Sequence, residues 1–185
     1  MRVEYALSVG RSGEKRAAVG QMVFTGYSQH AIDSKNRLAI PAKFRAKVDH
    51  KRDGKNWVIV FGQPPDRLWL YPDQYFESLA AKAVSALIPD QDLLRFDQMF
   101  FPAAETQELD TQGRIVIPDR MLRRADLGRE VVICGVRDHL EVRRPEGFEE
   151  ELARGWEKAQ ELQLKAKEAY ERSGGNPAGK PDGPG

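Results

Sequence analysis

One pattern of nine residues occurs twice in this 185-residue chain, and it constrains the fold more than any other feature. The copies occupy residues 33–41 and 110–118. Each reads Asp, three residues that include a turn former, Arg, an aliphatic residue, a small apolar residue, Ile and Pro. The offset that aligns them also aligns Phe24 with Phe101, nine residues before each Asp. We therefore interpret the chain as an internal duplication.

The residue before each Arg must accept a positive φ if the chain is to reverse tightly between two strands. Gly113 does so because it lacks a Cβ, and Asn36 is the commonest alternative to glycine. Three residues earlier in each copy, Asp33 and Asp110 can accept hydrogen bonds from the backbone amides of the turn. We expect these four residues to form the scaffold of two turns.

Each turn presents the Arg that follows it, Arg37 in the first copy and Arg114 in the second. The Asp four residues earlier can pair with this Arg and fix its direction. A fixed guanidinium can bind a phosphate through two hydrogen bonds or read a guanine through O6 and N7. Either Arg could equally serve only to close its turn. Because duplication supplies two, they become candidate contacts to a periodic polymer such as double-stranded DNA.

Other basic residues surround both motifs and are candidates for phosphate contacts. They are Lys35, Lys43, Arg45 and Lys47 near the first copy, and Arg120, Arg123 and Arg124 near the second. Residues 22–60 contain eight Lys or Arg against three acidic residues, whereas residues 61–109 contain three against eight. This alternation predicts one basic and one acidic surface, although ordinary solvated charge would give the same pattern.

Several classes of protein are not favoured. There is no apolar run of about 18 residues, which argues against a membrane span, and residues 1–21 lack the apolar core of a signal peptide. The single Cys134 excludes an internal disulfide, and three scattered histidines give no convincing zinc site. No phosphate loop or nucleophile with a neighbouring base is evident. We predict a cytoplasmic protein that is not an enzyme and binds no metal or cofactor.

Apolar alternation and apolar runs predict strands in both units. In the first unit they are residues 29–32, 38–40, 57–61 and 67–71; in the second, 105–109, 115–117, 131–135 and 139–142. Pro41 and Pro118 each fit the start of a short helix. Gly128 is expected to end the second of these helices.

Six segments follow from these assignments. They are a mobile extension (1–21, with Met22 as an alternative start), unit 1 (24–72), a helical connector (73–100), unit 2 (101–144), one long helix (145–172) and a disordered tail (173–185). The long helix carries a stripe of Leu152, Trp156, Ala159 and Leu162. We expect this stripe to pack on the chain's own body, and a partner-binding coiled coil is the alternative.

With these residues identified, the chain resembles the MraZ family, bacterial transcriptional regulators built from two AbrB-like swapped-hairpin units. Residues 22–26 resemble the family's Met-Phe-x-Gly start with one residue inserted, and residues 70–72 match the end of its first unit. The two Asp-x-x-x-Arg segments match the family's paired motif. Asn36 departs from the usual glycine of the first turn but leaves Arg37 in place.

The resemblance implies a mainly β fold with added helices (α+β), in which two AbrB-like units form a pseudo-symmetric double barrel and several chains form a closed ring. It also implies nucleoid-associated binding to short direct repeats upstream of the protein's own gene, in the division and cell-wall cluster, through Arg37 and Arg114. The alternative function is a scaffold or antitoxin-like ring that binds a protein partner and not DNA.

Overall fold

The computed structural model describes residues 22–82 and 90–172, which form a mainly β structure with several helices. The strands are β1 (Tyr27–Ala31), β2 (Arg37–Ala39), β3 (Trp57–Phe61), β4 (Arg67–Pro72), β5 (Glu105–Gln107), β6 (Arg114–Val116), β7 (Glu130–Val136) and β8 (His139–Arg143). The α-helices are α1 (Ala42–Arg45), α2 (Asp73–Lys82), α3 (Gln91–Phe100), α4 (Asp119–Arg124), α5 (Phe148–Glu157) and α6 (Ala159–Arg172), and η1 (Phe101–Ala103) is a 3-10 helix. The expected mobile extension and disordered tail lie outside the described residues.

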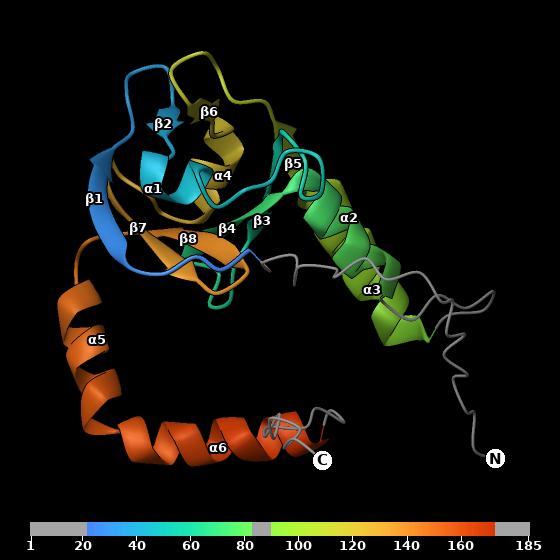
Figure 1. Cartoon of the computed structure of the whole chain (residues 1–185). Coiled ribbons are helices and arrows are strands. Elements are labelled where there is room, and N and C mark those ends of the chain that lie inside the picture. The colour runs from blue at the N-terminus through green and yellow to red at the C-terminus, as the bar shows by residue number, and fades with distance from the viewer. Residues whose placement is uncertain (1–21, 83–89, 173–185) are drawn as a thin grey trace, which may run out of the picture.

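Six strands form one antiparallel sheet in the order β1-β7-β8-β4-β3-β5 (Figure 1). The first strand of each unit pairs with a strand of the other unit, because β1 pairs with β7 and β5 pairs with β3. At the centre, β4 pairs with β8. Each of these strands has a counterpart in the other unit: β1 corresponds to β5, β3 to β7 and β4 to β8. When counterparts are exchanged, the order read from one edge of the sheet becomes the order read from the other edge.

The remaining two strands, β2 and β6, pair with each other as an antiparallel ribbon above the sheet (Figure 1). Leu38 lies opposite Ile115 in this ribbon, and both side chains are completely buried. They join the core with Phe24, Phe44 and Trp57. Because side chains alternate along a strand, the residues on either side of Leu38 and Ile115 point away from the core.

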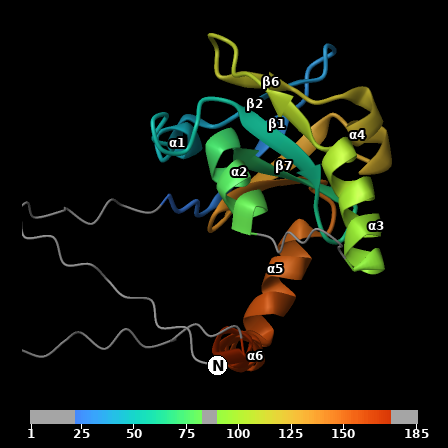
Figure 2. The same ribbon diagram turned by 90° about the vertical axis from the view of Figure 1, so that its right-hand side faces the viewer.

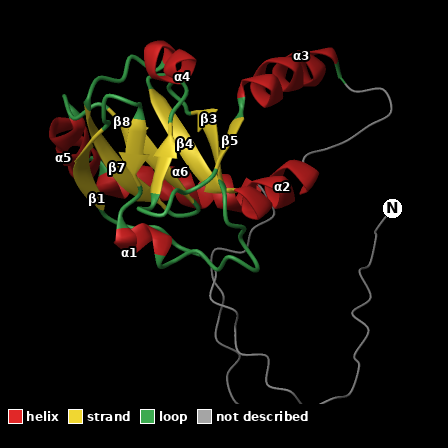
Figure 3. Ribbon diagram, turned by 90° about the horizontal axis from the view of Figure 1, so that it is seen from above, coloured by secondary structure: helices red, strands yellow, loops and turns green. Residues whose placement is uncertain are grey.

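Helices occupy different sides of this body (Figure 3). The short α1 and α4 lie on opposite sides, each beginning directly after the motif proline as predicted. The connector helices α2 and α3 lie at one end of the sheet, where Phe76 and Phe100 pack with Tyr71 and Val60 on its outer face. Residues 83–89 of the predicted helical connector lie outside the described residues.

The prediction of one long helix over residues 145–172 is wrong. The segment forms α5 and α6 with a break at Lys158 (Figures 1 and 2). Gly155 precedes the break by three residues, and glycine is a poor helix former by about 1 kcal/mol relative to alanine. The predicted packing of its stripe is also wrong, because Trp156 is 74% exposed and Leu162 is 50% exposed. Phe148, at the start of α5, is the buried residue of this helix.

The expected glycine stop after α4 is also incorrect. The helix ends at Arg124, and Asp126 takes the left-handed conformation with φ 51°. The Leu127 amide then donates to the Leu122 carbonyl at 2.9 Å, which satisfies one of the last carbonyls of the helix. Asp126, and not Gly128, is therefore the left-handed residue that ends the helix. Aspartate can adopt the left-handed conformation because its short polar side chain can form local hydrogen bonds.

The ribbon core gives a first prediction. Leu38→Ala or Ile115→Ala should lower the free energy of unfolding by roughly 2–5 kcal/mol, because each removes a fully buried side chain at the contact between the units. Urea denaturation measures the change. Val116→Ala is the matched control in the same strand, since Val116 is 45% exposed and should cost less than about 1 kcal/mol. Equal losses for the control and core variants would contradict this packing.

Candidate nucleic-acid interface

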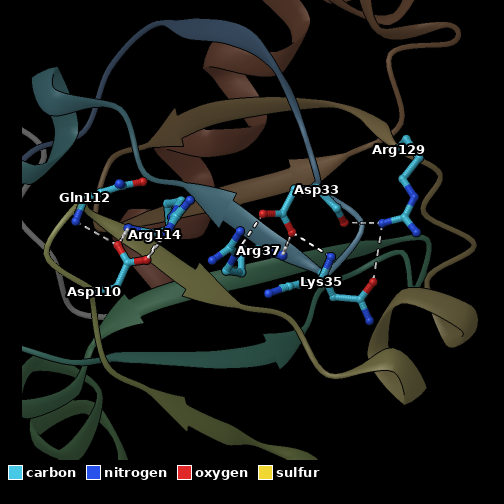
Figure 4. A network of polar contacts seen from close by, with 8 residues as sticks. Asp33, Lys35, Arg37, Asp110, Gln112, Arg114 and Arg129 are labelled. Atoms are coloured by element: carbon cyan, nitrogen blue, oxygen red, sulfur yellow. Dashed lines mark hydrogen bonds and ion pairs between the residues drawn. The ribbon is translucent and has the colours of Figure 1, made fainter.

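Asp33 organises the first turn through three contacts (Figure 4). Its Oδ1 accepts hydrogen bonds from the backbone amides of Lys35 at 2.8 Å and Arg37 at 2.9 Å. Its Oδ2 accepts one from Arg37 Nε at 2.6 Å. Asn36 has φ 58°, in the left-handed region that the turn was expected to require. One carboxylate therefore fixes both the backbone of the turn and the direction of the arginine.

The second turn has the same arrangement. Asp110 Oδ1 accepts from the amides of Gln112 and Arg114, both at 2.9 Å. Arg114 contacts Asp110 Oδ2 through Nε at 2.8 Å and Nη2 at 2.7 Å. Gly113 has φ 75°. The repeated sequence pattern thus corresponds to a repeated set of hydrogen bonds.

Each turn is also bonded to the other unit. The Asn36 carbonyl accepts from the Ile117 amide at 2.8 Å, and the Gly113 carbonyl accepts from the Ile40 amide at 2.9 Å. These residues occupy equivalent positions of the two motifs. The left-handed residue of one copy therefore holds the end of the motif strand in the other copy.

This pairing brings Arg37 and Arg114 together on one surface. In the ribbon Arg37 lies opposite Val116 and Arg114 lies opposite Ala39, so the arginines are diagonal neighbours on the face turned away from the core (Figure 4). Diagonal residues of an antiparallel pair lie roughly 7–8 Å apart. Their side chains are 31% and 24% exposed. A guanidinium has five N–H donors, so pairing with one Asp leaves donors for another acceptor.

The other predicted site residues lie in different environments. Lys35 is exposed beside the first turn. Lys43 Nζ donates to the Tyr27 carbonyl at 2.9 Å and lies 4.8 Å from the centroid of the Phe44 ring, so it is directed toward β1. Arg45 Nε donates to the Ile40 carbonyl at 3.0 Å. The site therefore does not gather all three around Arg37.

Arg45 lies directly against the glycine of the second turn. A Cβ built on Gly113 would lie 2.7 Å from Arg45 Cζ and Nε, closer than van der Waals contact allows. The guanidinium of the first unit thus covers the turn of the second. A side chain at residue 113 would have to displace it.

Arg129 was missed in the sequence. Its Nη1 donates to the Asp33 carbonyl and lies 3.5 Å from Asn36 Oδ1, so a residue of the second unit holds the first turn (Figure 4). The backbone carbonyl of Arg129 also accepts from the Ile32 amide at 2.8 Å. No motif predicts this contact, because 93 residues separate Arg129 from Asn36 and only the pairing of β1 with β7 brings them together.

The basic residues predicted around the second copy have partners within the fold. Arg120 pairs with Glu105, and Arg123 pairs with Asp119. The Arg124 guanidinium lies 5.3 Å from the centroid of the Phe61 ring. Pairing alone does not distinguish them from the ribbon arginines, which are also paired with aspartates. The ribbon arginines differ because they lie side by side on one outward strand face, which makes them the better candidates for anion binding.

The turn contacts also determine the ionisation of the two aspartates. The backbone hydrogen bond from Arg37, followed by its side-chain hydrogen bond, lowers the pKa of Asp33 to about 2. The side-chain hydrogen bond from Arg114 is the largest cause that lowers the pKa of Asp110. Both carboxylates are therefore ionised near neutral pH, when each can accept from its arginine.

Comparisons with known proteins identify the family to which the chain belongs. The family model described as "MraZ protein, putative antitoxin-like" matches residues 23–96 and again 99–171. The chain belongs to the MraZ family. The resemblance inferred from the motifs is confirmed, and the two matches follow the duplication.

Three relatives named Transcriptional regulator MraZ are similar to the chain. That of Thermomicrobium roseum is 39% identical over 127 residues, which cover 68% of this chain and 84% of the relative. That of Roseiflexus sp. is 33% identical over 132 residues (71% and 87%), and that of Clostridium tetani is 30% identical over 128 residues (69% and 86%). This membership supports a role in the regulation of transcription.

Across residues 22–82 and 90–172, none of the helices is long and apolar enough to cross a membrane. The same residues contain no cluster of His, Cys, Asp or Glu suited to hold a metal ion.

The pKa of Asp33 gives a pH prediction. Its folded value of about 2 lies below the ordinary value of 3.8, so the ionised form stabilises the fold above about pH 4. This stabilisation should be lost as the pH falls through about 2. Asp33→Asn should reduce stability at pH 7, and the difference from the unmodified protein should shrink between pH 4 and pH 2. Urea denaturation at several pH values measures both.

The exposed Asp92→Asn controls for the loss of a surface charge at pH 7, because its side chain is 91% exposed. A stability difference between Asp33→Asn and the unmodified protein that stays constant down to pH 2 would contradict the assigned hydrogen bonds.

Proposed function

We propose that this protein is a sequence-specific DNA-binding transcription regulator whose β2–β6 ribbon contacts DNA through Arg37 and Arg114. The main support for this proposal is the placement of the two motif arginines, which are 77 positions apart in sequence. They are diagonal neighbours on one outward face of the ribbon, and each is oriented by an Asp. Membership in a family whose curated relatives are named transcriptional regulators supports the same conclusion.

The ribbon suits a groove of DNA. The major groove of B-DNA is about 12 Å wide and admits a two-stranded β-ribbon. An arginine whose Nε is held by a carboxylate keeps its direction, and its remaining donors can reach a guanine edge or a phosphate. The exposed Lys35 and the more distant Lys43 and Arg45 then add phosphate contacts, which position the protein without reading sequence.

We propose further that the two units form the pseudo-symmetric double AbrB-like barrel that the resemblance implied. The exchange of first strands between units supports it. The domain limits stay as predicted from the sequence: units at 24–72 and 101–144 with a connector at 73–100. In this arrangement Asp33, Asn36, Asp110 and Gly113 are scaffold residues, which hold the arginines and do not touch bases.

We also propose a closed ring of several chains. Two apolar surfaces support an assembly: α3 exposes Leu94, Phe96 and Met99, and the elbow of α5 and α6 exposes Trp156 and Leu162. They lie at opposite ends of the chain's body (Figure 3), an arrangement that suits head-to-tail contacts between copies. A ring would present the ribbons at regular intervals to short direct repeats upstream of the protein's own gene, in the cytoplasm and at the nucleoid.

The second candidate is an interaction module that binds a protein partner and not DNA. The groove of about 400 Å³ at the α5–α6 elbow favours it, because Trp156, Leu152 and Leu162 line this groove and remain exposed. Recovery of one stoichiometric protein partner, together with no binding to upstream DNA at any salt concentration, would favour this function over DNA binding.

Arginine substitutions test the DNA proposal. Arg37→Ala and Arg114→Ala should each weaken binding to the upstream DNA by about 5- to 150-fold, because a bidentate base contact contributes about 1–3 kcal/mol. Fluorescence anisotropy over a salt series measures affinity, and each lost phosphate contact should lower the slope of log K against log salt by about 0.9. Arg95→Ala on α3 is the matched control, with a side chain that is 75% exposed.

Both variants should retain the oligomer and the fold of the unmodified protein. Unchanged affinity in both variants, with the unmodified protein binding its DNA, would refute the assigned site. Absent or salt-independent binding by the folded, unmodified protein would refute the function itself.

The exposed tryptophan tests the assembly. Trp156→Ala should shift the protein toward smaller species, with a rise of about 30-fold in the dissociation constant if the side chain contributes the 2 kcal/mol typical of an interface hot spot. Sedimentation velocity over a dilution series measures this change. Val23→Ala removes another exposed apolar side chain and should leave the assembly intact. If only the Val23→Ala control lost assembly, or if neither variant did, α5 and α6 would not form part of the interface.

A further inference from the structure

The two turns differ in how the opposite unit holds them. Arg45 of the first unit covers Gly113, and its Nε bonds to the Ile40 carbonyl. Arg129 of the second unit bonds to the Asp33 carbonyl and reaches Asn36 Oδ1. One turn has no side chain at its left-handed residue and is covered by an arginine. The other has an asparagine whose side chain is itself within reach of an arginine.

We propose that Arg129 is a positioning residue for Arg37: it keeps the Asn36 turn in its left-handed conformation and thereby fixes the direction of the first DNA-contacting arginine. This inference rests on the proposed function for its effect on DNA, but its structural part does not.

The reason lies in the conformational cost of Asn36. A non-glycine residue at positive φ carries a penalty that glycine avoids, and asparagine accepts this region because its side chain can bond locally. Here Asn36 Oδ1 lies beside a charged donor, Arg129 Nη1, and the preceding Asp33 carbonyl accepts from the same nitrogen. The hydrogen bond to the Asp33 carbonyl is charge-assisted and therefore stronger than a neutral one, while Asn36 Oδ1 lies at 3.5 Å from the same nitrogen, the limit of hydrogen-bond distance.

The position of Arg129 makes the contact independent of the motif. Arg129 directly precedes β7, and its backbone carbonyl accepts from the Ile32 amide, next to the strand pair that joins β1 to β7. A shift of the first strand relative to the second unit would therefore separate Arg129 from the turn. Arg129 also lines a cleft of about 520 Å³ beside the turn, with Asn36 and Arg123.

Loss of the side chain should have a local effect. Arg129→Ala should increase the hydrogen-exchange rate of the Lys35 and Arg37 amides about 10-fold, since both donate to Asp33 in the turn. The Gln112 and Arg114 amides of the second turn are the internal control and should keep their exchange rates. Arg123→Ala is the matched variant, because it removes an exposed arginine of the same cleft that pairs with Asp119.

Glycine at residue 36 provides the decisive test. If Arg129 stabilises the left-handed conformation of Asn36, then Asn36→Gly should make the turn less dependent on it. The Arg129→Ala substitution should then accelerate exchange of the two amides by less than about 3-fold in the Asn36→Gly background. An equal acceleration in both backgrounds would overturn the inference, as would an equal effect of Arg123→Ala.

Measurements of DNA affinity distinguish two roles of Arg129: positioning of Arg37, and a direct contribution of its own positive charge. Arg129→Ala should weaken binding about 5- to 10-fold, and Asn36→Gly should restore most of it although the positive charge stays absent. Recovery by Arg129→Lys, with the first turn still exchanging fast, would show that Arg129 acts through its charge and would overturn the inference. If the unmodified protein binds no DNA, the proposed function fails, and the exchange measurements still decide the role of Arg129.

Discussion

The backbone bonds between the two motifs are the constraint on which the rest of the structure depends. Asn36 and Gly113 each direct a carbonyl to the isoleucine amide of the other copy, and these bonds enclose the buried Leu38–Ile115 pair. Neither unit could complete this ribbon alone, because each contributes one of its strands. The positive φ of the turns, the exposure of the arginines and the burial of the aliphatic residues all follow from one pairing register.

The ion pairs at the turns contribute orientation more than stability. Pairs between partly exposed Arg and Asp side chains contribute typically 0–1 kcal/mol because water screens them. The same Asp also accepts two backbone hydrogen bonds, so the turn and the side chain form one unit. An arginine held in this way loses less conformational entropy on binding than a free one. In the proposed function, an ion pair with little stabilising value thus still orients an arginine toward DNA.

Much of the fold could be predicted from local sequence. The run Trp57–Phe61 became β3, and the prolines after each motif began helices, because apolar patterns and a fixed φ act over a few residues. The hydrogen bonds at Asp33 and Asp110 could likewise be predicted. Contacts that depend on tertiary structure could not: Arg129 meets Asn36 only through strand exchange, and Arg45 covers Gly113 from the other unit.

Two incorrect predictions about helices have separate causes. The stripe that includes Trp156 has the spacing of a packed helix, but spacing gives no information on which surface covers it. The stop after α4 came from Asp126 because asparagine and aspartate can replace glycine where a left-handed residue is needed. A rule for glycine alone therefore placed the end too late.

In the proposed function, the outer face of the β2–β6 ribbon lies against DNA. A DNA-cleaving iron chelate attached at Gln112→Cys tests it most directly, because Gln112 is an exposed residue of the second turn. Burial raises the pKa of Cys134 to about 11, so the native thiol should stay unmodified. The expected result is cleavage within the upstream repeats at regular intervals, and none from the same chelate at the exposed Asp92→Cys of α3. Cleavage from Asp92→Cys and none from Gln112→Cys would contradict it.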